Sequence, residues 1–294
     1  MPEAAAARGE VWQVIDGGVQ DLSRLAGPID YRFMQPVAVA ARGHLVYIVD
    51  AGLQKLFVYD SQIDRIHILK DLRGVLHSDA AAIFLDRDFS FFIADSASGR
   101  VMHFDTNGKL IKTLEDRLNL GRPVAVTVNP DSGYIFVADG FKDHVLAFDP
   151  TGALTAAIGD RGQGPGRFLG ITALAEGPRG FYIGTRFGED RVQVMGNDGL
   201  YLESFQRDTV TFPTAIAVRS DGLAFVSDYL ADDIKVYRGT ELVDTIGGHG
   251  GAPGKFRRIT GLWLDQDSLY VADSLNRRVQ VLSLASWELS HPAP

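Results

Sequence analysis

Short apolar runs separated by turn residues follow one another along the whole chain, and they recur with a fixed period. The most regular element is an aromatic residue, two small or β-branched residues and an aspartate. It occurs at residues 47–50, 92–95, 136–139, 225–228 and 270–273, with a degenerate copy that ends in Thr185 at residues 182–185. Successive copies are 45, 44, 46, 43 and 45 residues apart. A constant period of this length indicates a repeat architecture.

One repeat contains four predicted strands. After Pro213 the apolar runs 215–218, 224–226, 234–237 and 242–246 are separated by turns that contain Gly, Asp or Ser. Such runs are strand signals, and no window shows the 3.6-residue periodicity of a helix over helical length. Six antiparallel four-stranded units predict an all-β fold, a six-bladed β-propeller with blades around a central channel.

The two ends of the chain predict how the ring closes. The last repeat lacks a good fourth strand after residue 282, whereas an orphan strand at residues 11–15 precedes the first repeat. We expect that strand to complete the last blade, because closure removes an unpaired edge. The expected organisation is an N-terminal tail (1–9), one propeller (10–284, with 10–17 completing the last blade) and a C-terminal tail (285–294). In the third strands we expect Gln193, Lys235 and Gln280 to face outwards.

Composition narrows the class of protein. With 46% hydrophobic and 22% charged residues, the chain can bury an ordinary globular core. A net charge of −8 argues against a nucleic-acid partner, since such binders usually carry basic excess. The absence of cysteine excludes disulfides, thiolate metal sites and cysteine nucleophiles. No apolar stretch approaches the roughly 18 residues of a transmembrane helix, and the N-terminus lacks a signal-peptide pattern.

Two interblade linkers, residues 158–168 and 246–256, are rich in glycine and end in Gly-Pro-Gly-Arg-Phe and Ala-Pro-Gly-Lys-Phe. We interpret their glycines as structural, since glycine allows positive φ angles and close backbone passage. Neither linker opens a helix or carries the Gly-Lys-Ser/Thr ending of a phosphate-binding loop.

The repeats resemble NHL repeats, which combine a proline-initiated strand, Tyr-Val-Ala-Asp, Arg-Val-Gln-Val and a Gly-Pro-Gly-Phe linker. The best copy spans residues 268–281. The resemblance implies a six-bladed propeller, but the family includes RNA binders, lyases, receptor ectodomains and bacterial sensors or scaffolds. A free-standing ring is most similar to the bacterial extracytoplasmic type. It implies a monomer in the periplasm or outside the cell, with the cytoplasm as the alternative.

The same resemblance implies a structural role for the repeat aspartates. They would anchor the following loop and pair with the basic residue that opens the next strand. Expected pairs are Asp95 with Arg100, Asp139 with His144 and Asp273 with Arg278. Five similar aspartates cannot form one active site, and Thr185 stands at the equivalent position of the sixth repeat.

An enzyme is the alternative to a binding protein. An amidating lyase of this family would need histidines around a channel zinc ion, and a lactonase-like propeller would need carboxylates around a calcium ion. The candidates for a catalytic site at the channel mouth are His77, Arg122, His249 and Arg258. Two well-placed histidines are too few for the roughly three zinc ligands of a catalytic site. The predicted inner strands offer too few carboxylates for calcium. We therefore expect no cofactor, with a channel-bound Zn or Ca ion as the alternative.

The loops between second and third strands suggest a different role. They carry large apolar and basic residues, which are typical of interaction surfaces. We predict a non-enzymatic binding or scaffold propeller that presents one loop face to a protein or peptide partner. The predicted contact residues are Phe141, Lys142, Arg186, Phe187, Tyr229 and Leu230.

Overall fold

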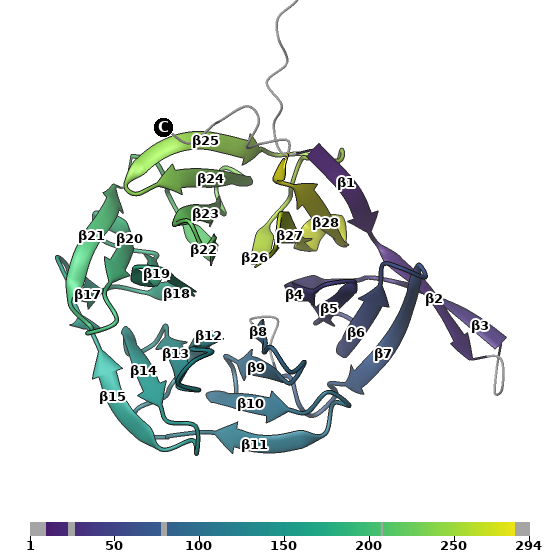
Figure 1. Cartoon of the computed structure of the whole chain (residues 1–294), viewed down its shortest axis with the longest axis horizontal. Coiled ribbons are helices and arrows are strands. Elements are labelled where there is room, and N and C mark those ends of the chain that lie inside the picture. Colours follow the sequence, from purple (N-terminus) through teal and green to yellow (C-terminus); the bar gives the residue numbers. More distant parts are fainter. Residues whose placement is uncertain (1–9, 23–26, 78–80, 207, 286–294) are drawn as a thin grey trace, which may run out of the picture.

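Six four-stranded antiparallel sheets stand radially around a central channel, which confirms the predicted six-bladed β-propeller (Figure 1). The structure is a computed structural model that describes residues 10–22, 27–77, 81–206 and 208–285. The expected N-terminal tail and residues 286–294 of the expected C-terminal tail lie outside the described residues.

The blades are numbered 1 to 6 in the order of their first strands. Blade 1 consists of β4 (Pro36–Arg42), β5 (Leu45–Asp50), β6 (Lys55–Asp60) and β7 (Arg65–Asp71). Blade 2 consists of β8 (Ala81–Leu85), β9 (Phe91–Asp95), β10 (Arg100–Phe104) and β11 (Leu110–Leu114). Blade 3 consists of β12 (Pro123–Val128), β13 (Ile135–Asp139), β14 (His144–Phe148) and β15 (Leu154–Ile158).

Blade 4 consists of β18 (Ile171–Gly177), β19 (Gly180–Thr185), β20 (Asp190–Met195) and β21 (Tyr201–Gln206). Blade 5 consists of β22 (Pro213–Val218), β23 (Leu223–Asp228), β24 (Asp233–Arg238) and β25 (Glu241–Gly247). Blade 6 consists of β26 (Ile259–Asp265), β27 (Ser268–Asp273), β28 (Arg278–Ser283) and β1 (Glu10–Ile15). The other elements are β2 (Gly17–Leu22), β3 (Gly27–Arg32), β16 (Asp160–Arg161), β17 (Arg167–Phe168) and the 3₁₀ turn η1 (Ser274–Asn276).

The core consists of apolar clusters between neighbouring blades. Six such clusters of buried residues occur in the described part of the chain, one for each pair of adjacent blades. The repeat pattern lies on the second strands, and β9, β19 and β23 are buried along their whole length. Both faces of these strands pack against other blades, which explains their continuous apolar runs.

The N-terminal strand closes the ring, as predicted. β1 pairs antiparallel with β28, with Val14 opposite Gln280 and Ile15 opposite Val279. The side chain of Ile15 is buried in the cluster between blades 6 and 1. The first and last strands of the described chain are therefore neighbours in one sheet.

The prediction for the third-strand glutamines was wrong. Gln193 and Gln280 are almost completely buried, and each carboxamide binds the linker that enters its blade. Gln280 accepts a hydrogen bond from the Gly254 amide at 2.9 Å and donates to the Lys255 carbonyl at 2.8 Å. Gln193 accepts from the Gly166 amide and donates to the Arg167 carbonyl in the same way. A polar side chain can be buried here because backbone groups satisfy it.

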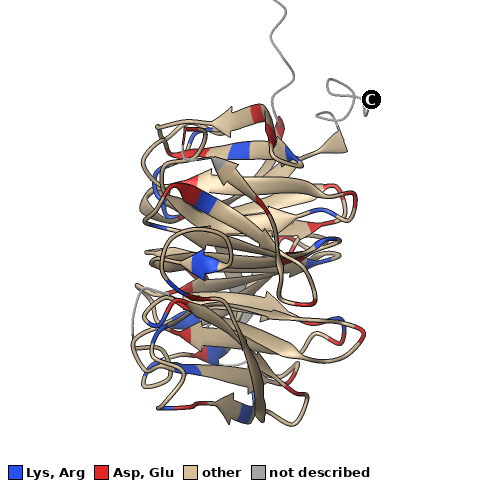
Figure 2. Cartoon of the chain, turned by 90° about the vertical axis from the view of Figure 1, so that its left-hand side faces the viewer, with Lys and Arg blue, Asp and Glu red and all other residues tan. Residues whose placement is uncertain are grey.

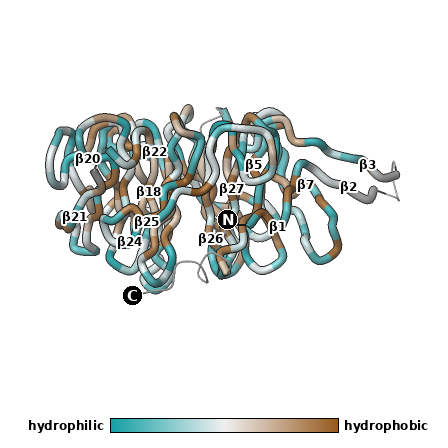
Figure 3. The backbone as a smooth tube through the Cα atoms, turned by 90° about the horizontal axis from the view of Figure 1, so that it is seen from above, coloured by the Kyte–Doolittle hydropathy of each residue, from teal (hydrophilic) through white to brown (hydrophobic). Residues whose placement is uncertain are grey.

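A two-stranded hairpin that the repeat pattern does not predict leaves the ring next to β7. Its strands β2 and β3 pair from Gly17 opposite Arg32 to Leu22 opposite Gly27. Figures 1 and 3 show the hairpin extending beyond the rim of the disc. Strands β2 and β3 therefore form a separate β-ribbon between β1 of blade 6 and β4 of blade 1.

The edge-on view shows charged residues mainly in the loops and turns on the two faces of the disc (Figure 2). The loop face is defined here by the interblade linkers and the loops between second and third strands. The turn face is defined by the hairpin turns on the opposite side. Within the described residues, no helix is long and apolar enough to cross a membrane.

Candidate functional site

A cavity of about 800 Å³ opens on the loop face at the mouth of the channel. Its wall combines the loops of blades 2 to 5 with the linkers that enter blades 3 to 6. Four aromatic side chains line it, and they are Phe141, Phe187, Phe212 and Tyr229. Cavities of this size commonly bind small molecules or short peptide segments. It is the main candidate for a functional site.

The repeat aspartates hold the loops that form this wall. The carboxylate of Asp228 accepts hydrogen bonds from the amides of Thr211 at 2.6 Å and Leu230 at 3.0 Å. Asp139 does the same with the amides of Arg122 at 3.2 Å and Phe141 at 2.7 Å. Each buried carboxylate thus connects a linker to the loop of the same blade, so the predicted anchoring role is observed.

Of the three side-chain pairs predicted for these aspartates, the structure shows one, Asp273 with Arg278. Arg278 Nε donates to Asp273 Oδ2 at 2.8 Å, as expected. Arg100 instead donates to the Val75 carbonyl. A side chain from the linker, His77, takes its place beside Asp95 at 3.0 Å.

The third pair was also wrong. His144 Nε2 lies 2.9 Å from the Asn119 carbonyl oxygen, while the Asp139 carboxylate is occupied by backbone amides. Beside His144, the Asn119 carbonyl oxygen of the linker thus takes the place that the Asp139 carboxylate was expected to fill.

Blade 4 replaces the missing repeat aspartate with a carboxylate from blade 3. The hydroxyl of Thr185 donates to the Asp190 carbonyl at 2.8 Å. Asp143 Oδ1 accepts hydrogen bonds from the amides of Gly170 at 2.6 Å and Ile171 at 3.0 Å, at the end of the linker into blade 4. Asp143, held by these hydrogen bonds, is part of the cavity wall.

Four of the six predicted contact residues lie in the wall of this cavity. Phe141, Arg186, Phe187 and Tyr229 line it, and Phe141 and Phe187 are 64% and 55% exposed. Leu230 is exposed next to Tyr229, and the Lys142 amide is held by Asp139, but neither residue belongs to the cavity wall.

The four catalytic candidates do not converge. Arg122 and Arg258 line the cavity, whereas His77 and His249 are not part of its wall. His77 Nδ1 lies 3.0 Å from Asp95, and His249 Nδ1 lies 2.6 Å from Asp232. Both imidazoles therefore have partners that explain them as parts of linkers.

The described side chains that could bind a metal ion do not converge either. Among the described residues, no group of three or more His, Cys, Asp or Glu side chains is arranged to hold a metal ion. The threonine hydroxyls at the channel entrance join blades instead. Thr172 donates to the Pro213 carbonyl at 2.7 Å, and Thr214 donates to the Ile259 carbonyl at 2.8 Å.

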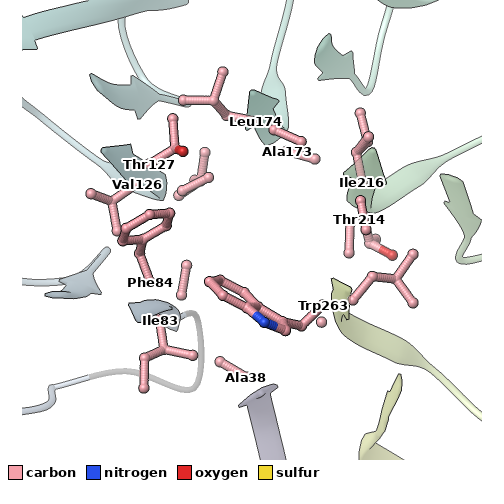
Figure 4. Close-up of a pocket in the computed structure, with 18 of the residues that line it drawn as sticks. Ala38, Ile83, Phe84, Val126, Thr127, Ala173, Leu174, Thr214, Ile216 and Trp263 are labelled. Atoms are coloured by element: carbon pink, nitrogen blue, oxygen red, sulfur yellow. The ribbon is translucent and has the colours of Figure 1, made fainter. Parts of the chain in front are cut away.

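Below the mouth the channel is narrow and mainly apolar (Figure 4). This inner part has a volume of about 230 Å³, and Thr172, Thr214 and Thr260 line both it and the mouth cavity. The rings of Phe84 and Trp263 meet edge to face at 5.6 Å. The Trp263 Nε1 donates to the Ala41 carbonyl at 2.7 Å, so the indole is fixed in place.

The titratable groups with the largest pKa shifts lie in the blades rather than in the cavity wall. Burial raises the pKa of Tyr237 to about 12, and its hydroxyl donates to Thr209 at 2.9 Å. Burial, reinforced by the Asp64 carboxylate, raises the pKa of Tyr59 to about 12. These phenols serve packing and hydrogen bonding.

Sequence reasoning missed Phe212, Asp143 and Arg161 as cavity residues. Phe212 precedes the proline of a first strand, a position that repeats at the loop face and could have been noticed. Asp143 has a φ of +62°, a conformation that aspartate adopts more readily than most residues. Its role could not be inferred because its partners come from the next blade.

Comparison with known proteins supports the fold. No family model matches the chain. A solved structure described as streptogramin B lyase aligns with 93% of this chain and 99% of its own, with a TM-score of 0.66 and 12% sequence identity. At that identity the likeness shows a shared propeller fold and does not extend to activity.

Proposed function

We propose that the chain is a non-enzymatic binding propeller that holds a protein or peptide partner at its loop face. One observation carries the proposal: exposed aromatic residues from different blades converge on a single cavity. Phe141, Phe187 and Tyr229 belong to blades 3, 4 and 5, and all three line it. Aromatic residues dominate the binding energy of protein interfaces, and a cavity gives them a site that a partner can fill.

The arrangement of the loops supports a preformed site. Buried carboxylates fix the backbone on both sides of Phe141 and Tyr229, because Asp139 and Asp228 accept hydrogen bonds from several amides. A rigid site loses little conformational entropy on binding, so more of the contact energy appears as affinity.

Selection from a random peptide library displayed on phage tests the proposal even though the natural partner is unidentified. Selected peptides should bind the wild-type protein and lose about 2 kcal/mol, roughly 30-fold in affinity, with Phe187→Ala. Leu200→Ala is the matched control, because Leu200 is 65% exposed but lies on the turn face. Equal losses with both variants, or a selection that yields no specific peptide, would contradict the proposal.

A lyase or hydrolase at the channel mouth is the second candidate, and Arg122 and Arg258 in the cavity wall favour it. A similar fold occurs in the protein described as streptogramin B lyase. Incubation with streptogramin B, followed by mass spectrometry, and metal analysis of the purified protein test this candidate together. Turnover, or stoichiometric zinc or calcium, would replace the binding proposal with an enzymatic one.

We also propose that the repeats are of the NHL type and that the protein acts outside the cytoplasm as a monomer. The buried Asp273, Arg278 and Gln280 of the best repeat support the first part, since they bind one another and the linker. Fractionation of cells that express the full natural gene, and light scattering of the purified protein, test the compartment and the monomeric state.

A further inference from the structure

The cavity at the mouth has the opposite sign of charge to the protein as a whole. The chain carries a net charge of −8. Among the described residues of the cavity wall, Arg122, Arg161, Arg186 and Arg258 are basic and Asp143 is the single acidic residue. A local excess of guanidinium groups in a concave site attracts an anionic ligand.

Two of these arginines are positioned by groups that carry no charge. Arg122 Nη2 donates to the Gly140 carbonyl at 2.6 Å. The Arg186 guanidinium lies over the rings of Phe187 and Phe212, at 5.1 and 5.0 Å from their centroids. A stacked guanidinium presents its edge, and its planar fork of donors fits a carboxylate in a bidentate manner. These contacts orient the positive charges without neutralising them.

The acidic residue of the wall is already engaged. Asp143 Oδ1 accepts hydrogen bonds from the amides of Gly170 and Ile171, and Oδ2 lies 3.7 Å from Arg161 Nε. The positive charge of Arg161 and the two amide donors offset the charge of Asp143 and so reduce its repulsion of an anionic ligand. With Arg161 beside Asp143, the remaining positive charge of the wall comes from Arg122, Arg186 and Arg258.

We infer that the cavity binds an acidic peptide segment, with Asp or Glu carboxylates on Arg186 and Arg122 and an apolar residue among the aromatic rings. The inference rests on the proposed function and names the chemistry of its partner. The aromatic side chains of Phe141, Phe187 and Tyr229 surround the same space, so charge and apolar surface are presented together. A volume of about 800 Å³ holds a few residues of an extended chain.

A peptide fits these observations better than a nucleic acid does. A long polyanion would have to approach a protein of net charge −8 along a continuous basic surface, whereas the arginines here surround one cavity. A short acidic segment needs only that local field.

Fluorescence anisotropy with three defined peptides tests the inference. The peptides are fluorescein-labelled Gly-Phe-Glu-Glu-Phe-Glu-Gly and its counterparts with Gln or Lys in place of Glu. The Glu peptide should bind about tenfold more tightly than the Gln peptide, which corresponds to one charge-assisted contact. Its affinity should fall between about 25 mM and about 300 mM NaCl, because salt screens exposed charges.

Single substitutions test whether the arginines cause the difference in affinity between the Glu and Gln peptides. Arg186→Gln should weaken binding of the Glu peptide about tenfold and weaken binding of the Gln peptide much less. Arg122→Gln is the second variant, with thermal unfolding measured to confirm that the loop is intact. Arg87→Gln is the matched control, because it removes the same charge from the turn face, where Arg87 lies 3.6 Å from Asp131. It should change neither affinity.

The outcomes separate the two proposals. Equal affinities for the Glu and Gln peptides, or no effect of Arg186→Gln, would overturn the inference of an acidic ligand. The proposed binding site would still be supported if library-derived peptides bound Phe187→Ala more weakly than the wild-type protein. Tighter binding of a single-stranded uridine 12-mer than of the Glu peptide would overturn the inference in favour of RNA. Failure of every defined and library-derived peptide to bind would overturn both proposals.

Discussion

In five of the six blades, a buried aspartate is the residue on which both blade and loop depend. In blade 6, Asp273 is fully buried and accepts hydrogen bonds from Arg278, Gln280, Asn276 and the Arg257 amide. The charge is tolerated in the core because several donors surround it. Since Arg278 is also buried, neither partner can turn to solvent if the other is lost.

Asp273→Asn should therefore lower the free energy of unfolding by about 3 kcal/mol, because it leaves a buried guanidinium without its carboxylate. Urea unfolding at pH 7 measures the change. Asp16→Asn is the control, since the pair of Asp16 and Arg32 is more than 60% exposed on both sides and should contribute less than about 1 kcal/mol. Comparable losses in the two variants would show that burial of the pair does not matter.

His103 makes stability depend on pH. Its ring stacks on Phe92 at 4.0 Å, and burial, with a smaller effect of Lys112, lowers the pKa of this imidazole. The unfolded state then takes up a proton at higher pH than the folded state does. The contribution of His103 is complete above the unfolded pKa of about 6.5 and is lost as pH falls through that value towards the folded pKa.

His103→Phe keeps an aromatic ring on Phe92 and removes the titrating group. The variant should lose less stability than the wild type between pH 7.5 and pH 5.5, as measured by urea midpoints with equal m-values. A wild-type midpoint that does not fall over this range would contradict the assignment.

Residue-level partners could be predicted only in part from the sequence. The spacing of Asp273 and Arg278 gives their pairing, because both lie at the same end of adjacent strands. The same reasoning failed for Asp95 and Arg100, where His77 from the linker reaches the carboxylate. Spacing fixes which residues face each other across strands, but it does not tell which linker atom comes closer.

At the scale of elements, the linkers connect one blade to the next through a common device. Asp143 and Asp232 both have positive φ angles, and both accept hydrogen bonds from amides of the following linker. Each aspartate also lies beside a side chain of that linker: Asp143 beside Arg161, and Asp232 beside His249. Both side chains stand two residues after the first glycine of their linker. Blade 4 depends on this device more than blade 6, because Thr185 stands where blade 6 has Asp273.

Asp143→Gly removes the carboxylate and still permits the positive φ. It should lower the free energy of unfolding by about 2 kcal/mol through the loss of two hydrogen bonds to a charged acceptor. The loss should be smaller when Thr185→Asp is present, because a carboxylate at position 185 restores the anchor found in the other blades. Equal losses in the two backgrounds, measured by chemical unfolding, would refute the compensation.

The strands could be predicted from the sequence, whereas the hairpin of β2 and β3 could not. Each strand of a blade recurs in several repeats, so its position in one repeat can be checked against the others. The hairpin occurs once and contacts the ring mainly through β7, so no periodic signal marks it.

At the scale of the whole molecule, pairing of β1 with β28 closes the ring. The constant period predicts the number of blades, and the orphan strand predicts the closure. The sequence places Arg122, Arg186 and Arg258 on the loop face, but their convergence with Arg161 on one cavity could not be predicted, because these residues come from different parts of the chain. They become neighbours only when the blades are arranged around the channel.

A disulfide across the closure tests its contribution to stability. Glu10 and Ser283 are opposite each other at the end of the β1–β28 ladder, a separation that a disulfide can span. The double variant Glu10→Cys and Ser283→Cys should gain about 2–4 kcal/mol when oxidised relative to its reduced form. The natural chain has no cysteine, so no other thiol competes. Identical unfolding curves with and without reductant would contradict a stabilising effect of a cross-link at the closure.

The pairing of β1 with β28 also sets an order for biosynthesis. A ribosome releases residues 10–15 before any of the six first strands β4 to β26, yet the strand that receives them ends at Ser283. Strand β1 must therefore wait, with its backbone donors and acceptors open, until the last blade of the propeller has emerged. Truncated translation products retain this open edge, which can pair with other chains. Premature termination is thus expected to produce aggregates rather than smaller stable rings.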